Sequence, residues 1–215
     1  MKRLDTPELL DEHDAPAPDM QRSLRDLRRI NRYLGGLSIY RRSVQLVDER
    51  PRSVLDLGAG TADGLDALPG RPLRIALDFK IDHLLYLREG SPTRRVVGDA
   101  SKLPFRDASV DVVTSGHFFH HFTPDENARI LGEALRVSRK GVAVNDTRRH
   151  LVPLLFISLL GWLRLVGRIT RFDGPASVRR AYELDEARAI ASQTGAPRFA
   201  VKRFFPFRFG ILLWR

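Results

Sequence analysis

Apolar residues near the start of the chain recur at the spacing of an amphipathic helix. In the segment 19–34 they lie three or four positions apart, opposite an arginine-rich face. They are Leu24, Leu27, Ile30 and Leu34. The pair Gly35-Gly36 ends this helix, and a second short helix is predicted over 38–48. The preceding segment 1–18 carries prolines and little apolar periodicity, so it is predicted to be a flexible arm.

From residue 53 onward, short apolar runs alternate with helical periodicities. Strands are predicted over 53–57, 74–77, 95–97, 110–114 and 141–144, and helices over 62–67, 81–88 and 123–137. After a helix over 183–194, the strands 198–205 and 208–213 flank Pro206 and form an antiparallel pair at the sheet edge. Such alternation indicates an α/β fold in which helices cover both faces of a mainly parallel sheet. We therefore predict one domain over 19–215, with residues 19–48 as a helical cap.

The segment 147–182 interrupts this alternation. It contains the apolar run 151–163, which is too short for a membrane span of about 20 residues. Pro153, Ser158 and Gly161 interrupt the run, and Arg164 follows it. We predict a helical lid over the site, and the alternative is an interfacial helix that makes peripheral contact with a membrane.

Composition narrows the classes of protein. The chain has 215 residues, no cysteine and a net charge of +10, which excludes disulfide frameworks, thiol nucleophiles and thiolate zinc sites. A strongly basic chain suggests nucleic acid or an anionic membrane as partner, but the arginines are scattered along the whole chain. Specific nucleic-acid binding is therefore not expected. The first residues lack the apolar stretch of a signal peptide, so the expected location is cytoplasmic.

Three carboxylates follow three successive predicted strands. Ligands of parallel sheets bind beyond the carboxyl ends of the strands. Asp56 precedes the turn Gly58-Ala59-Gly60, and a carboxylate there disfavours a pyrophosphate and suits a ligand with an amine and a sulfonium. Asp78, after the second strand, can accept both hydroxyls of a ribose. Asp99, after the third, can accept from an adenine amino group.

These motifs in combination resemble the class I S-adenosylmethionine-dependent methyltransferases, of the small bacterial type similar to the ubiquinone and menaquinone biosynthesis enzymes. The resemblance covers roughly 53–144 and rests on the stretches VLDLGAGTADG, LDFK, GDASKLPF, VDVVTSG and LRVSRKGVAVND. It implies a Rossmann-like seven-stranded sheet with a reversed C-terminal strand, and S-adenosylmethionine as cofactor.

The resemblance also implies cofactor-binding positions. They are Asp56, Gly58, Ala59, Gly60, Asp78, Phe79, Asp99, Ala100 and His117. Asp56 and the glycine turn match the methionine-binding motif, Asp78 matches the ribose-binding acid, and Asp99 with Ala100 matches the adenine site. His117 falls where the family lines the boundary between cofactor and substrate.

Candidate catalytic residues follow the fourth and fifth strands. Methyl transfer from a sulfonium requires in-line positioning, which supplies about 7–11 kcal/mol, and a base when the acceptor is a phenol or enol. His120 and His121 are the candidate bases, and Asp146 is a second candidate base or substrate anchor. The carboxylate pattern of metal-requiring relatives is absent from the sequence, so no metal is expected.

We therefore expect methyl transfer to a small, largely apolar acceptor such as a phenol, quinol or enol, with O-methylation favoured over C-methylation. Phe118, Phe119, Phe122 and the run 151–163 are expected to form the apolar acceptor pocket. The alternative is an RNA or protein methyltransferase that uses the basic surface, although the Ser115-Gly116-His117-Phe118 stretch lacks an amino-group methylation motif. A cofactor-binding protein without activity is the third reading.

Overall fold

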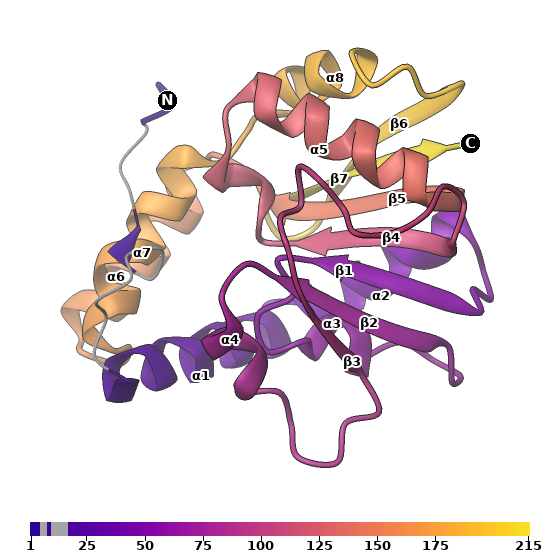
Figure 1. Ribbon diagram of the computed structural model, residues 1–215. Coiled ribbons are helices and arrows are strands. Elements are labelled where there is room, and N and C mark those ends of the chain that lie inside the picture. Colours follow the sequence, from indigo (N-terminus) through magenta and orange to yellow (C-terminus); the bar gives the residue numbers. More distant parts are fainter. Residues whose placement is uncertain (5–7, 10–16) are drawn as a thin grey trace.

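A mixed seven-stranded sheet forms the centre of the molecule (Figure 1). The computed structural model describes residues 1–4, 8–9 and 17–215. Within them the strands are β1 Ser53–Leu57, β2 Leu73–Asp78, β3 Arg94–Val97, β4 Val110–Gly116, β5 Ser138–Thr147, β6 Arg198–Phe204 and β7 Arg208–Trp214. All seven lie where the sequence predicts a strand, with ends displaced by a few residues at most.

The order across the sheet is β3-β2-β1-β4-β5-β7-β6. Strands β1 to β5 pair in parallel, whereas β7 runs antiparallel to both β5 and β6. The predicted antiparallel pair at the sheet edge is thus confirmed, with β7 as the reversed strand. In register, Leu57 at the end of β1 lies beside Leu77 and Ser115, so the carboxyl ends of three strands meet at one edge.

Helices cover both faces of the sheet. One face packs against α2 Gly36–Val47, α3 Asp63–Asp66 and α4 Ile81–Leu85, and the other against α5 Pro124–Val137 and α8 Leu184–Ser192. Successive strand residues point to opposite faces, so Val54 belongs to the α2 side and Leu55 to the α5 side. Asp56 therefore points to the same side as Val54, toward α2.

A helical layer lies across the end of the sheet to which the parallel strands point (Figure 1). It consists of α1 Ala17–Tyr33, α6 Leu151–Trp162 and α7 Arg168–Arg180, with α7 packed between the other two. Leu154, Ile157 and Val178 form a small core between α6 and α7. Asp26 of α1 accepts a hydrogen bond from the Gly167 amide at the start of α7 (2.7 Å). The sequence predicts the first and second of these helices within a few residues, but α7 was not anticipated.

The N-terminal residues that the structure describes lie against this layer. Arg3 donates to the carbonyl oxygen of Arg180 (2.7 Å), and the Leu4 amide donates to the carbonyl oxygen of Arg179 (3.2 Å). The predicted flexible arm falls mostly on 5–7 and 10–16, which lie outside the described residues. In the described part of the chain, no helix is both long and apolar enough to cross a membrane.

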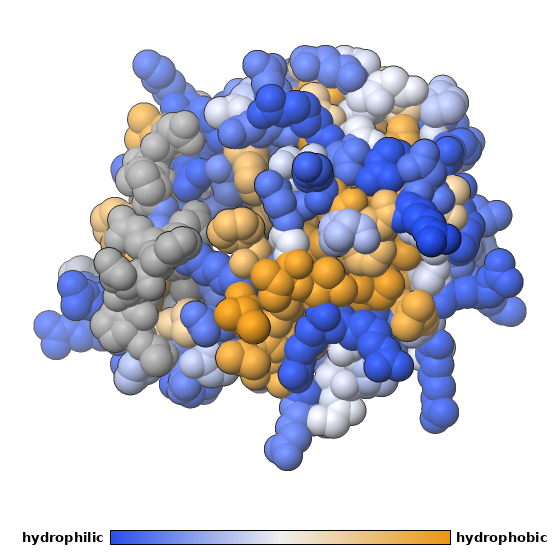
Figure 2. Space-filling model, in the orientation of Figure 1, coloured by the Kyte–Doolittle hydropathy of each residue, from blue (hydrophilic) through white to orange (hydrophobic). Residues whose placement is uncertain are grey.

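One edge of the sheet is less covered than the rest. The connection 98–109 between β3 and β4 contains no helix, and exposed apolar side chains gather beside it, on β3, on α4 and at the end of β2. They are Phe79, Ile81, Leu85 and Val97. Figure 2 shows an apolar area in the middle of the view, over this part of the molecule.

Candidate active site

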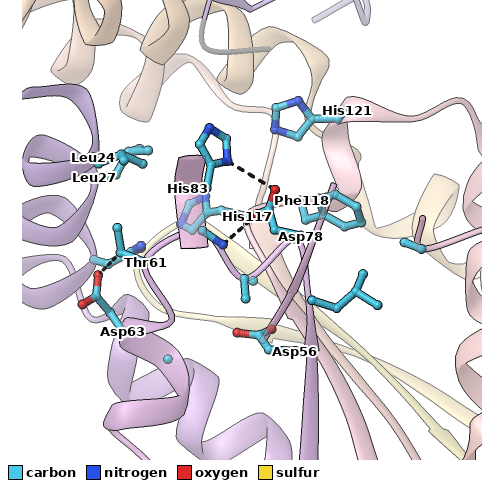
Figure 3. Close-up of a pocket in the computed structure, with 18 of the residues that line it drawn as sticks. Leu24, Leu27, Asp56, Thr61, Asp63, Asp78, His83, His117, Phe118 and His121 are labelled. Carbon is cyan, nitrogen blue, oxygen red and sulfur yellow. Dashed lines mark hydrogen bonds and ion pairs between the residues drawn. The ribbon is translucent and has the colours of Figure 1, made fainter. Parts of the chain in front are cut away.

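A cavity of about 560 Å³ opens at the carboxyl ends of β1, β2 and β4. Its volume is within the range of small-molecule sites. Leu24, Leu27 and Asn31 of α1 close one side of it, and the segment 116–122 after β4 closes the other (Figure 3). From the insertion 147–182, the cavity receives Ser177 of α7 and no residue of α6. The expectation that the run 151–163 lines the acceptor pocket is therefore wrong, because α7 lies between that run and the cavity.

The turn after β1 brings backbone amides to the cavity. Gly58 (φ 62°) and Gly60 (φ 52°) adopt the left-handed conformation that favours glycine. A Cβ on Gly58 would overlap the ring of Phe118, whereas a Cβ on Gly60 would meet no atom within 4 Å. Gly58 is thus needed for close packing, and Gly60 borders open space in which a ligand fits.

Asp78, at the end of β2, is fixed by backbone and side-chain donors. Its carboxylate accepts hydrogen bonds from the amides of Gly60 and Lys80, both at 2.9 Å, and lies 3.3 Å from Nδ1 of His83. Burial opposes the charge of Asp78, but His83 and these amides outweigh it and lower the pKa of the carboxyl. Asp78 is therefore a stable anion in the cavity. The buried Nε2 of His83 has no hydrogen-bond partner among the described residues.

Asp56 is in a different electrostatic state. It is buried in the cavity wall, beside Tyr40 of α2, and its Oδ1 has no hydrogen-bond partner among the described residues. Burial raises the pKa of Asp56 to about 8. The Tyr40 hydroxyl opposes this increase, and the negative charge of Asp78 adds to it by a smaller amount. The carboxyl is thus mostly neutral at pH 7. A cationic ligand group beside it would favour its ionised form.

His117 and Arg208 meet at the back of the site. His117 has a left-handed backbone (φ 56°), which is uncommon outside glycine and concentrates at functional sites. Its Nε2 contacts the guanidinium of Arg208, which also donates to Oδ1 of Asn31 (3.1 Å). Burial and the charge of Arg208 lower the pKa of His117 well below its usual range. His117 is therefore neutral and faces the cavity as an uncharged imidazole.

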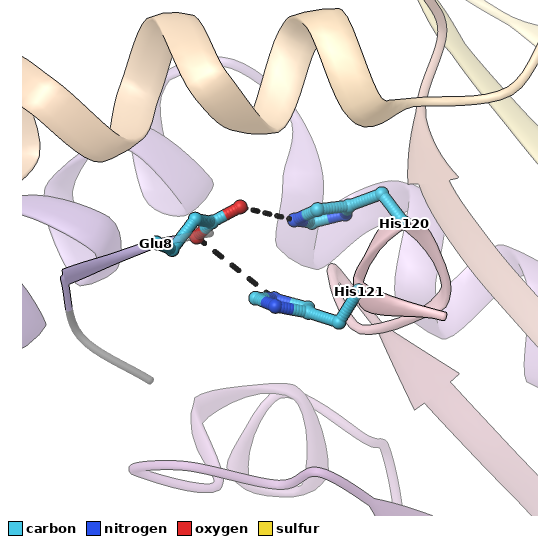
Figure 4. A group of neighbouring side chains, drawn as sticks. All are labelled: Glu8, His120 and His121. Carbon is cyan, nitrogen blue, oxygen red and sulfur yellow. Dashed lines mark ion pairs between the residues drawn. The ribbon is translucent and has the colours of Figure 1, made fainter. Parts of the chain in front are cut away.

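His120 lies between two carboxylates. Its Nδ1 is 2.9 Å from Oδ1 of Asp146, and its Nε2 is 3.3 Å from Oε1 of Glu8 (Figure 4). Burial opposes a charged imidazole, but Asp146 and Glu8 outweigh it and raise the pKa of His120 to about 10. Burial also opposes the charge of Asp146, but His120 and the backbone amide of Thr147 outweigh it and hold the pKa of the Asp146 carboxyl below its usual range. In this arrangement His120 is an imidazolium, oriented by Asp146.

Glu8 also faces the second histidine. Its Oε2 lies 3.9 Å from Nε2 of His121, and the ligand-capable atoms of Glu8, His120 and His121 all lie within 4.8 Å of one another. Such a set is close enough to share one cation. The carboxylate already balances the charge of His120, however, so the ion pairs account for the arrangement by themselves.

The structure brings the predicted site residues together at one cavity, with a single exception. Every predicted cofactor-binding residue lines it, as do His120 and His121, whereas Asp146 lies behind His120. Sequence reasoning missed Glu8, Tyr40, His83 and Arg208. His83 lies in the helix just after the Asp78 motif and could have been considered, but no sequence signal links the other three to the site.

The assembled site and the sheet order can now be compared with known proteins. A family model described as a methyltransferase domain matches residues 55–144, the part of the chain that supplies the glycine turn and the three carboxylates. The match covers less than half of the chain, and what it shows is similarity to a methyltransferase domain over this segment.

Curated relatives share part of their length with this chain. An uncharacterized methyltransferase of Mycobacterium tuberculosis is 36% identical over 131 residues, 60% of this chain and 51% of the relative. A demethylmenaquinone methyltransferase of Thermotoga maritima is 31% identical over 146 residues, 62% of each chain. The chain thus spans about half the length of the relatives of the first kind.

Solved structures show the same fold. The plantazolicin methyltransferase BpumL, in complex with a monoazolic desmethylPZN analog and SAH, aligns with a TM-score of 0.70 at 14% identity, and the alignment covers 92% of this chain and 91% of that one. Human N-acetylserotonin methyltransferase, in complex with SAM, aligns with a TM-score of 0.61 over 89% of this chain and 54% of that one, at 14% identity. At this identity the likeness concerns the fold alone.

Proposed function

We propose that this methyltransferase transfers the methyl group of S-adenosylmethionine to a hydroxyl group of a small, largely apolar acceptor. The observation that carries the proposal is that two different half-sites share one cavity. One half holds the glycine turn with Asp56 and Asp78. The other holds the His120–Asp146 pair with the neighbouring Phe118 and Phe122, and Leu24 and Leu27 of α1 close the cavity on the opposite side.

The cofactor half fits S-adenosylmethionine. The unpaired buried oxygen of Asp56 suits an ammonium group, and the anionic Asp78 suits ribose hydroxyls. Open space beside Gly60 leaves room for the ligand between them. When bound, the cofactor supplies an activated methyl group on a sulfonium. Asp99 and Ala100, at the far end of the same wall, are proposed to contact the adenine.

The acceptor half supports O-methylation through His120. As long as Glu8 occupies its Nε2 side, His120 is protonated and has no capacity for a further proton. We propose that the acceptor hydroxyl takes the place of Glu8, which leaves Asp146 beside His120. Removal of one negative charge lowers the pKa of the imidazole, and the Nε2 proton of His120 leaves to solvent together with Glu8. The neutral Nε2 then accepts the hydroxyl proton as the oxygen attacks the methyl group, whose bond to sulfur breaks.

The class of acceptor is proposed from the cavity and from the relatives. Leucine and phenylalanine side chains on the acceptor side favour an apolar ring, and several relatives are demethylmenaquinone methyltransferases. A quinol or a phenol fits both observations. The neutral His117, beside the two half-sites, is proposed to contact the acceptor or the sulfur end of the cofactor.

The test uses methyl-labelled S-adenosylmethionine with a panel of hydroquinones, naphthoquinols, phenols and, as a contrast, structured RNA. We expect labelled product from quinols or phenols and not from RNA. His120→Gln should lower turnover about 10²–10⁴-fold, the usual contribution of a general base, with little change in binding of S-adenosylhomocysteine. Asp56→Asn should instead weaken binding of S-adenosylhomocysteine. Labelling of RNA alone, or full turnover by His120→Gln, would contradict the proposal.

A further inference from the structure

The outer side of α6 is apolar and exposed. Six of its side chains form what we call the α6 face: Leu151, Val152, Leu155, Phe156, Leu159 and Trp162. Their spacing of three and four residues puts them on one side of the helix, away from Leu154 and Ile157, which contact α7. Leu155 is 66% exposed and Trp162 is 76% exposed. A contiguous apolar surface of this kind marks an interaction site.

Arginines lie beside the C-terminal end of the α6 face. Arg22, Arg164, Arg168 and Arg171 are exposed, and we call them the basic rim. Arg171 of α7 lies against Gly161 of α6, and Arg22 of α1 lies against Gly167 at the start of α7. These two arginines are therefore close to the end of α6. Asp173 is the only acidic residue in 147–182. It is buried and accepts a hydrogen bond from the Leu9 amide (2.7 Å). Within 147–182 the exposed charge is therefore positive.

The apolar helix face and the basic rim together favour an anionic bilayer over a second copy of the chain as the partner. A second copy of the chain in a symmetric dimer would bring two basic rims together, which costs electrostatic energy. An anionic bilayer offers acyl chains for the apolar face and negative headgroups for the arginines. With 12 residues, α6 is about 18 Å long, which suits a helix that lies in the plane of the interface and does not cross it.

We propose that the α6 face is a membrane-binding surface that lies in the headgroup region of an anionic lipid bilayer, with the basic rim against the phosphates. The surface lies close to the cavity. Ser177 of α7 lines the cavity, and the next residue, Val178, packs against α6. A lipophilic molecule in the bilayer is then one helix away from the site. The proposal does not depend on which acceptor is methylated, and lipid binding alone tests it.

The experiment is flotation of the full chain with vesicles of phosphatidylcholine, with and without 30% phosphatidylglycerol as an anionic component (about the level that gives a strong surface potential). Trp162 serves as an intrinsic probe in a Trp214→Phe background, because the chain has only 2 tryptophans. We expect binding to anionic vesicles, a blue shift of Trp162 emission, and quenching by brominated acyl chains. High salt should weaken binding, since the headgroup attraction is screened.

Two variants and one control separate the contributions. Leu155→Gln/Leu159→Gln should reduce binding at least tenfold, and Arg164→Gln/Arg168→Gln/Arg171→Gln should do so as well, at about fivefold per arginine. Phe205→Gln removes an apolar side chain that is 91% exposed, on the β6–β7 turn, and should leave binding unchanged. All variants should bind S-adenosylhomocysteine as the parent does, since neither α6 nor the basic rim lines the cavity.

Three results would overturn the proposal. The first is absence of binding to anionic vesicles by the parent chain. The second is equal loss of binding in Phe205→Gln and Leu155→Gln/Leu159→Gln. The third is a dimer, observed by light scattering, that the α6 variant dissociates while vesicle binding is unaffected, which would assign the face to a second copy.

Discussion

The charge of Asp56 should control cofactor binding through pH. The pKa of this buried carboxyl is about 8, so roughly one molecule in ten carries the ionised form at pH 7. Only the ionised form pairs with the ammonium group of the cofactor. The affinity for S-adenosylhomocysteine should therefore rise about tenfold from pH 6 to pH 7, and less steeply toward pH 8. Binding near pH 7 should release close to one proton.

Asp56→Asn removes this dependence. The variant should bind S-adenosylhomocysteine about tenfold or more weakly at pH 8, which is the usual loss for a charge-assisted hydrogen bond of about 1.5–3 kcal/mol. Between pH 6 and pH 7 its affinity should be almost flat. The amino group of the ligand titrates near pH 8 in both proteins, so the difference between the two curves isolates Asp56.

The ionisation of Asp56 that favours cofactor binding should lower the stability of the folded protein itself. The pKa of Asp56 is raised on folding, so the unfolded chain loses this proton at a lower pH than the folded chain does. Stability therefore falls as pH rises from about 4 to 8, by as much as about 5 kcal/mol. Asp56→Asn should accordingly unfold at a higher temperature than the parent at pH 8, while it binds the cofactor less well.

Calorimetry in buffers of different ionisation enthalpy measures both the affinity and the proton count. Asp185→Asn is the matched control, because its side chain is 95% exposed on α8 and its removal should change neither curve. A parent affinity that is flat from pH 6 to pH 8, or an Asp56→Asn variant with parental affinity, would refute the assigned role of Asp56.

Three further predictions follow, two on contacts of the cavity wall and one on helix α5. Glu8→Gln should lower the pKa of His120, so the pH at which turnover begins should move down. Because the folded pKa of His120 is raised to about 10, its ion pair stabilises the fold below this pH, and the variant should lose about 1–3 kcal/mol near neutral pH and little above pH 10, as measured by thermal unfolding. Gly58→Ala should weaken binding of S-adenosylhomocysteine at least tenfold in calorimetry, because the new Cβ overlaps Phe118 in a left-handed turn. Gly132→Ala, whose Cβ meets no atom within 4 Å inside α5, should stabilise the protein by about 1 kcal/mol. An unchanged pH profile in Glu8→Gln, or parental binding in Gly58→Ala, would contradict these assignments.

The sequence by itself determined the sheet and one half of the site. Short apolar runs, the first three of them followed by a glycine or a carboxylate, identify parallel strands, and the geometry of a parallel sheet brings their carboxyl ends to one edge. Asp56, Gly60 and Asp78 could therefore be assigned to one cavity from the sequence. Asp56 lies at the end of the first strand with Gly60 just after it, and Asp78 lies at the end of the second. The structure agrees, with the Gly60 amide bonded to Asp78.

Only the tertiary structure decided the other half. Glu8 meets His120, and Arg208 meets His117, across long stretches of sequence, and no local pattern encodes such pairings. The orientation of the apolar run 151–163 could not be predicted from the sequence either. The run is apolar on every side of a helix, so its periodicity does not indicate which side packs against the rest of the protein. Packing against Val178 of α7 settles this. It turns one side of α6 inward and leaves the other, with Trp162, exposed to the surroundings.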